Sequence, residues 1–195
     1  MKIKKSRDLE STEMDQSVTQ LHTLVSLYQE EITKEVSRVL ASGYSGIEKE
    51  RAPRNWGTGE IKWRPMFIKY SGENVALSER MPKLREIVSA FPEVPTFYVS
   101  VFRPGMVITE EKEQGKKYYY ALDCPKGESF TVQSSETVFR CKKGDGLVLS
   151  DSKFHSAWNH GRSTHLILVA HIPRDSYPSI PPGIKTFLDG EGINL

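Results

Sequence analysis

Histidine is the side chain in this sequence with the clearest capacity for chemistry. His155 follows a polar corner at residues 150–152 and opens an expected strand, and His165 and His171 fall on one face of a later strand because side chains two residues apart share a face. A neutral imidazole is a ligand for iron, zinc or copper. The sequence therefore offers a metal site as one interpretation and satisfied, purely structural histidines as the other.

Short strands must position these histidines. From residue 96 onward, alternating apolar residues are separated by turns that contain Gly, Pro, Asp or Ser, which predicts a sandwich or barrel and not alternating βαβ units. A lead-in strand is expected earlier, at 63–70. The later strands are expected at 96–103, 105–110, 116–123, 129–133, 136–141, 146–150, 153–158 and 164–172.

Two helices are expected before this β-rich region. Apolar residues from Val18 to Val39 recur at steps of three and four, which predicts one long helix over 13–41. Its apolar stripe is expected to pack against the outside of the sheet, and a dimer contact is the alternative. A second, short helix begins at Pro82 and ends before Pro92.

Length and composition favour one globular domain without disulfides. The chain has 195 residues, 27 Lys and Arg against 25 Asp and Glu, and two cysteines outside any CxxC pair. This near-neutral balance argues against nucleic-acid binding, the absence of a long apolar run argues against a membrane span, and the cysteine content favours the cytoplasm. The expected divisions are a flexible tail (1–12), a helix and connector (13–59), a barrel domain (60–173) and a Pro-containing tail (174–195).

Three sequence blocks resemble the aspartyl/asparaginyl β-hydroxylase family, a branch of the Fe(II)- and 2-oxoglutarate-dependent oxygenases. The first runs from Ile68-Lys-Tyr through Met-Pro-Lys-Leu to Phe91-Pro. The second is Ser100-Val-Phe-Arg-Pro-Gly. The third, residues 144–159, is similar to the family's Gly-x-x-x-x-Phe-Asp-Asp-Ser-x-x-His-x-x-Trp-Asn segment. The resemblance implies a mainly β fold, a double-stranded β-helix (jelly-roll, cupin-like) barrel, with the helices packed outside it.

The resemblance implies His155 as the distal metal ligand. At the position of the family's proximal metal histidine this sequence has Glu111, preceded by Glu110. A carboxylate is an accepted ligand for Fe(II), so Glu111 is the expected partner of His155, with Glu110 as the alternative.

The same resemblance implies residues that hold 2-oxoglutarate. Ser100 is kept before the Pro-Gly turn. Lys117 and Tyr119 stand where the family has Arg-x-His, and His165 stands where the last strand has Arg, with Arg162 nearby. A lysine binds a carboxylate as a point charge, without the two-donor fork of arginine.

Two function classes follow. The first is an oxygenase that uses Fe(II) and 2-oxoglutarate to hydroxylate a C–H bond of an amino-acid or protein side chain. The second is a catalytically inactive barrel that binds a small ligand or a partner chain, because fold does not prove function. A metal-dependent, cupin-like enzyme that uses no 2-oxo acid is a third possibility, and the sequence does not identify the substrate.

Overall fold

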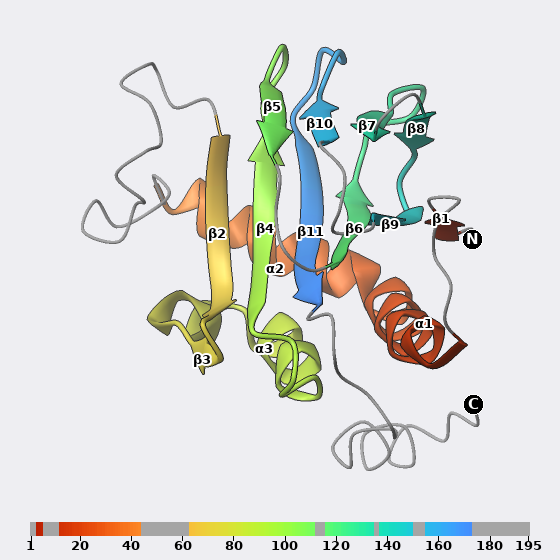
Figure 1. The fold of residues 1–195 in the computed structure, drawn as a ribbon. Helices are drawn as coiled ribbons and strands as arrows, with labels where there is room; N and C mark the ends of the chain where they lie inside the picture. The colour runs from red at the N-terminus through yellow and green to blue at the C-terminus, as the bar shows by residue number, and fades with distance from the viewer. Residues whose placement is uncertain are drawn as a thin grey trace.

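Two β-sheets face each other, and three helices cover the outer face of the larger one (Figure 1). The computed structural model describes residues 3–5, 12–43, 63–111, 116–134, 137–149 and 155–172. The larger sheet has the strand order β1-β9-β6-β11-β4-β2-β3, and the smaller has β5-β10-β7-β8. This two-sheet arrangement confirms the mainly β, double-stranded β-helix fold expected from the sequence.

The strands form where the sequence alternates and contains β-branched or aromatic residues. The central strands β4, β6 and β11 pair antiparallel and are buried along nearly all of their length. The bounds are β1 Ile3–Lys5, β2 Trp63–Tyr70, β3 Glu73–Asn74, β4 Thr96–Phe102, β5 Val107–Glu111, β6 Lys116–Asp123, β7 Phe130–Ser134, β8 Thr137–Cys141, β9 Gly146–Leu149, β10 His155–Trp158 and β11 His165–Ile172.

The prediction of a single N-terminal helix over 13–41 is wrong in one respect: the structure divides the helix at Tyr28 into α1 (Thr12–Leu27) and α2 (Gln29–Ala41). Backbone hydrogen bonds from Tyr28 N to Leu24 O and from Ile32 N to Tyr28 O continue the helical pattern through the break. At the break, the Gln29 side chain donates to Leu122 O (2.7 Å) and accepts from the Tyr120 hydroxyl (3.0 Å). These contacts attach the bend to β6.

The third helix, α3 (Pro82–Ser89), follows the short 3-10 helix η1 (Ala76–Arg80) and begins at a proline, as expected. Within the segment expected to be a flexible tail, residues 3–5 instead form β1 and pair in parallel with β9. Most of the connector expected before residue 59 and the tail at 174–195 lie outside the described residues.

The core has two layers. One layer fills the space between the helices and the outer face of the larger sheet, and it contains the apolar stripe of α1 and α2 (Val18, Leu21, Val25, Ile32, Val36 and Val39). The stripe therefore packs against the chain's own sheet. The second layer lies between the two sheets and includes Tyr98, Phe102, Tyr119, Ala157 and Val169.

Close packing fixes the contact of α1 with the sheet. His22 is buried, and its Nδ1 atom is hydrogen-bonded to the Tyr118 hydroxyl at 2.8 Å. A Cβ added at Gly146 would lie 2.7 Å from the same Nδ1 atom. Glycine at this position therefore lets the imidazole approach the backbone of β9.

Candidate functional site

The candidate residues lie on strand faces directed into the space between the two sheets. Ser100 lies between Tyr98 and Phe102 on β4, and both of these belong to the inter-sheet core, so Ser100 shares their face. The same alternation places Lys117 with Tyr119 on the inner face of β6, and His155 with Ala157 on the inner face of β10. All of the polar residues in this set are buried.

His155 and Tyr119 meet inside the barrel. The Nε2 atom of His155 is hydrogen-bonded to the Tyr119 hydroxyl at 3.0 Å, and the two rings are near perpendicular with centroids 6.2 Å apart. Two residues that the resemblance assigns to different roles, one as a metal ligand and one on the co-substrate side, are therefore in direct contact.

The backbone of β5 brings Glu111 opposite His155. The antiparallel register pairs His155 with Glu111 and Ala157 with Ile108, so β5 contains one extra residue between these pairs. This β-bulge puts Glu111, and not Glu110, at the register position facing His155. Ser134 of β7 is the neighbour of His155 on the other side.

Lys117 lies near one end of the barrel. In the sheet it is paired with Leu149 of β9 and with His171 of β11. His171 is half-buried, and its Nε2 atom lies 3.4 Å from the hydroxyl of Tyr98. A buried ammonium group, a second imidazole and a phenol thus line the inner face at this end.

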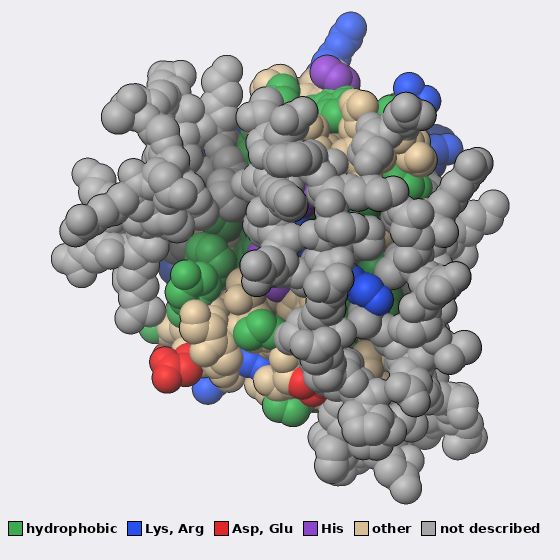
Figure 2. Space-filling view, viewed as in Figure 1, with side chains coloured by type: hydrophobic (Ala, Val, Ile, Leu, Met, Phe, Trp, Pro, Cys, Tyr) green, Lys and Arg blue, Asp and Glu red, His purple; other side chains and the backbone are tan. Residues whose placement is uncertain are grey.

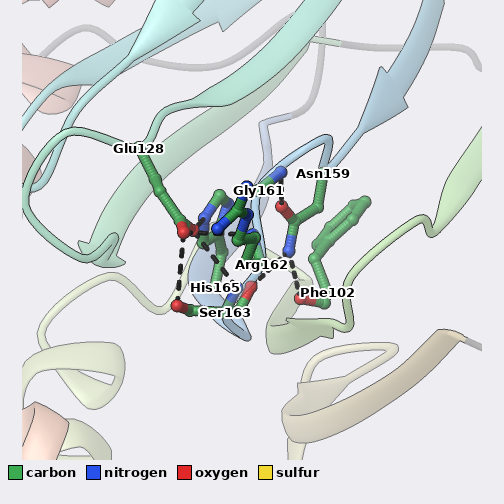
Figure 3. A network of polar contacts seen from close by, with 7 residues as sticks. All are labelled: Phe102, Glu128, Asn159, Gly161, Arg162, Ser163 and His165. Atoms are coloured by element: carbon green, nitrogen blue, oxygen red, sulfur yellow. Dashed lines mark hydrogen bonds and ion pairs between the residues drawn. The ribbon is translucent and has the colours of Figure 1, made fainter.

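His165 lies at the other end of the barrel and is held by Glu128 (Figure 3). Its Nε2–H donates to Glu128 Oε2 at 2.9 Å, and its Nδ1 atom is buried and meets no hydrogen-bond partner among the described residues. The Glu128 carboxylate also accepts from the backbone N–H groups of Arg162 (3.0 Å) and Ser163 (3.3 Å). These hydrogen bonds, first that from His165 and then those from the backbone, lower the pKa of Glu128.

Asn159 closes the same end of the barrel. Its Nδ2 atom donates to Phe102 O and to Ser163 O, each at 2.8 Å, and its Oδ1 atom accepts from the Gly161 N–H at 2.8 Å (Figure 3). The side chain thereby joins the end of β4 to the turn between β10 and β11. This is a structural role for the Asn that ends the Trp-Asn pair of the sequence motif.

The predicted 2-oxoglutarate residues do not all converge on one point. Along β11, His165 is paired with Phe102, Ile167 with Ser100, and His171 with Lys117. Six residues of strand separate His165 from the position of Lys117, which corresponds to about 20 Å. A five-carbon diacid cannot contact both side chains, so Lys117 and His165 cannot jointly hold one 2-oxoglutarate molecule.

Among the side chains that the structure describes, no three or more His, Cys, Asp or Glu are arranged to hold a metal ion; the side chains of Glu110 and Glu111 lie outside this set. None of the helices described is long and apolar enough to cross a membrane.

Sequence reasoning did not find Glu128, which lies 37 residues before its partner His165. Glu128 follows a Lys-Gly turn, and nothing in its local sequence separates it from a solvated glutamate. It also did not find the hollow lined by Arg140, Trp158, His160 and Arg162, because these residues come from a strand pair and a loop that meet only in the folded chain.

Comparison with known proteins gives one family match. Residues 28–175 match the family model of aspartyl/asparaginyl beta-hydroxylase. No curated protein sequence matches the chain.

Solved structures of low similarity were also found. They include a predicted oxalate decarboxylase from Thermotoga maritima (19% identity, TM-score 0.39, covering 45% of this chain and 73% of that one). A cupin superfamily protein from Desulfitobacterium hafniense has 15% identity and a TM-score of 0.36, covering 40% of this chain and 67% of that one. The TT1209 protein from Thermus thermophilus has 23% identity and a TM-score of 0.36, covering 41% and 73%.

Proposed function

Because the chain belongs to the aspartyl/asparaginyl beta-hydroxylase family, we propose that it is a hydroxylase that uses Fe(II) and 2-oxoglutarate with an altered metal site. The observation that carries the proposal is the pairing of buried His155 with Glu111 across β10 and β5. An imidazole nitrogen and a carboxylate oxygen form a donor set that suits Fe(II). His155 and Glu111 would hold the metal.

When bound, Fe(II) with 2-oxoglutarate supplies dioxygen activation for hydroxylation of an unactivated C–H bond. The chain's own contribution is to bind and orient. The hydrogen bond from the Tyr119 hydroxyl to Nε2 holds the His155 ring until a metal takes that atom, and Lys117, next on the same face of β6, places a buried amine where it can bind a carboxylate. The apolar residues between the two sheets exclude water from the site.

The proposal assigns the 2-oxoglutarate carboxylate to Lys117, with Ser100 and Tyr119 on the neighbouring inner positions. His165 is the less suitable anchor, because the Glu128 carboxylate on its Nε2 atom would repel a second carboxylate.

The substrate we propose is a small molecule or peptide carrying an amino-acid side chain. We propose the cytoplasm as the location, because the buried Cys124 and Cys141 are not joined in a disulfide.

One observation favours a second function, that of an inactive barrel that binds a ligand or partner. The Nε2 atom of His155 is already satisfied by Tyr119, so a metal bound through that atom must displace the hydroxyl. The third possibility, a metal enzyme without 2-oxo acid, would bind metal and show no 2-oxoglutarate affinity.

The test is Mn(II) and Fe(II) binding measured anaerobically, followed by 2-oxoglutarate titration and succinate release. His155→Ala and Glu111→Ala should each abolish or strongly weaken metal binding. The matched controls are His160→Ala, on an exposed histidine, and Glu110→Ala, at the adjacent position on β5. Unchanged metal affinity in His155→Ala, or equal losses in the two glutamate variants, would overturn the site. Metal binding without succinate release in any condition would overturn the oxygenase and leave the binding barrel or the metal enzyme that uses no 2-oxo acid.

A further inference from the structure

A hollow of about 650 Å³ lies on the outer face of the smaller sheet, outside the barrel interior. Its floor is one cross-strand row, because Trp158 of β10 is paired with Thr131 of β7, and Thr131 with Arg140 of β8. Its wall is formed by the turn at 127–129 and the loop at 160–162. The volume lies within the usual range for pockets that hold small ligands.

The wall of this hollow is held in place by hydrogen bonds within the fold. Glu128 accepts from the backbone of Arg162 and from both the backbone and the hydroxyl of Ser163, while Asn159 accepts from the Gly161 N–H (Figure 3). A Cβ on Gly161 would overlap the Glu128 carboxylate, so the glycine permits this close contact. A fixed wall lowers the entropy cost of binding a ligand.

The hollow is positively charged. Arg140 and Arg162 line it and are exposed, and Glu128 is the one carboxylate among the described residues that line it. The described residues that line the hollow thus carry two guanidinium groups against one carboxylate, which leaves a net charge of +1. In Figure 2, Lys, Arg and His side chains are visible at the end of the molecule where β10, β7 and β8 lie, and other Lys and Arg side chains are scattered lower on this face.

The hollow also offers an aromatic surface. The half-buried Trp158 indole lies against the ring of His160, with centroids 5.7 Å apart and planes at 59°. An indole face binds flat rings by stacking, and arginine is the preferred donor to carboxylate and phosphate groups.

We propose that this hollow is a binding site for a small aromatic anion, with the ring against Trp158 and a phosphate or carboxylate group between Arg140 and Arg162. The site lies apart from His155 and needs no metal. It is therefore independent of the proposed hydroxylase activity and can fail or hold separately.

The test is calorimetric titration of the full chain, without added metal, with four probes: phenyl phosphate, benzoate, inorganic phosphate and phenol. Phenyl phosphate or benzoate should bind saturably and at least about tenfold more tightly than inorganic phosphate or phenol, and the tighter of the two identifies the anionic group. No saturable binding of either aromatic anion, or equal affinity for inorganic phosphate and phenyl phosphate, would overturn the proposal.

Variants locate the binding. Arg140→Gln and Arg162→Gln should each weaken binding of the tighter aromatic anion by about tenfold, and Arg85→Gln, on the exposed face of α3, should leave it unchanged. Trp158→Leu should weaken binding of the aromatic anion by about fivefold without changing that of inorganic phosphate. As a second readout, the backbone amide resonances of Gly127 and Gly161 should shift on titration. Unchanged affinity for the aromatic anion in Arg140→Gln, Arg162→Gln and Trp158→Leu, or resonance shifts confined to residues outside the hollow, would refute this location.

Discussion

Replacing Asn159 by alanine should destabilise the protein more than any change at an exposed polar residue. The side chain is fully buried and makes three hydrogen bonds of 2.8 Å. Its loss strands the buried carbonyl of Phe102, which costs about 1–3 kcal/mol. The hydrogen bonds to Ser163 O and Gly161 N are half-buried, so water can replace the lost Asn159 side chain. The loss of each of these two bonds therefore costs about 0.5–1 kcal/mol of unfolding free energy. The expected loss in the free energy of unfolding is about 2–5 kcal/mol.

The assay is urea-induced unfolding followed by circular dichroism, with the midpoint compared at constant m-value. Asn74→Ala, on an exposed asparagine of β3, is the control and should change stability by less than about 0.5 kcal/mol. Asn159→Asp keeps the acceptor for Gly161 and removes both donors, so it should be at least as destabilising as alanine. A loss below about 1 kcal/mol in Asn159→Ala would show that the three bonds do not hold this end of the barrel, and the reasoning would be wrong.

Three further predictions use other parts of the fold. Tyr119→Phe should raise the Mn(II) affinity measured by calorimetry about fivefold, because the Tyr119 hydroxyl competes with the metal for Nε2 of His155. The control, Tyr70→Phe, should leave the Mn(II) affinity unchanged. A fall in affinity in Tyr119→Phe would instead make Tyr119 a positioning residue. Burial lowers the pKa of His22, so the folded protein favours the neutral imidazole. The contribution of His22 to the free energy of unfolding should therefore be fully present above the ordinary pKa of 6.5 and decrease as the pH falls below it. In urea unfolding, His22→Gln should flatten this dependence of the unfolding free energy on pH, and the same dependence in the variant and the wild type would contradict the prediction. Burial raises the pKa of the Cys124 thiol to about 12, so the thiol should not react with iodoacetamide at pH 8 in the folded protein. Mass spectrometry should therefore find Cys124 unalkylated in the folded protein and fully alkylated in urea. Equal labelling in both states would disprove this prediction.

The strands were predictable because their signals are local. Alternation and turn residues gave β2, β4 and the later strands to within a few residues of the observed bounds. Strand β1 was not predictable, because its partner β9 lies more than 140 residues away and three residues carry no periodicity. The bend at Tyr28 was missed for a related reason, since the contacts of Gln29 that accompany it come from β6 and the helical hydrogen bonds continue through it.

The environment of His165 shows the limit of motif-based reasoning. The resemblance assigns a carboxylate-binding role to this position, and the residue indeed binds a carboxylate, that of Glu128 within the same chain. A motif gives the residue type and position but not the partner, because the turn that carries Glu128 meets β11 only through the folding of the smaller sheet. The choice between His165 and Lys117 as anchor therefore depends on tertiary contacts that lie outside both motifs.

The register of β5 makes the same point for the metal site. The sequence leaves Glu110 and Glu111 as alternatives for the partner of His155, because neighbouring residues on a strand face opposite sides. The extra residue between the pairs Glu111–His155 and Ile108–Ala157 places Glu111, and not Glu110, opposite His155 in the register. No glycine or proline marks this bulge, although a slip of one residue exchanges the two glutamates at the facing position. If the metal is held at this register position, Glu111→Ala and Glu110→Ala must therefore differ in metal affinity even though the two variants have the same charge and composition.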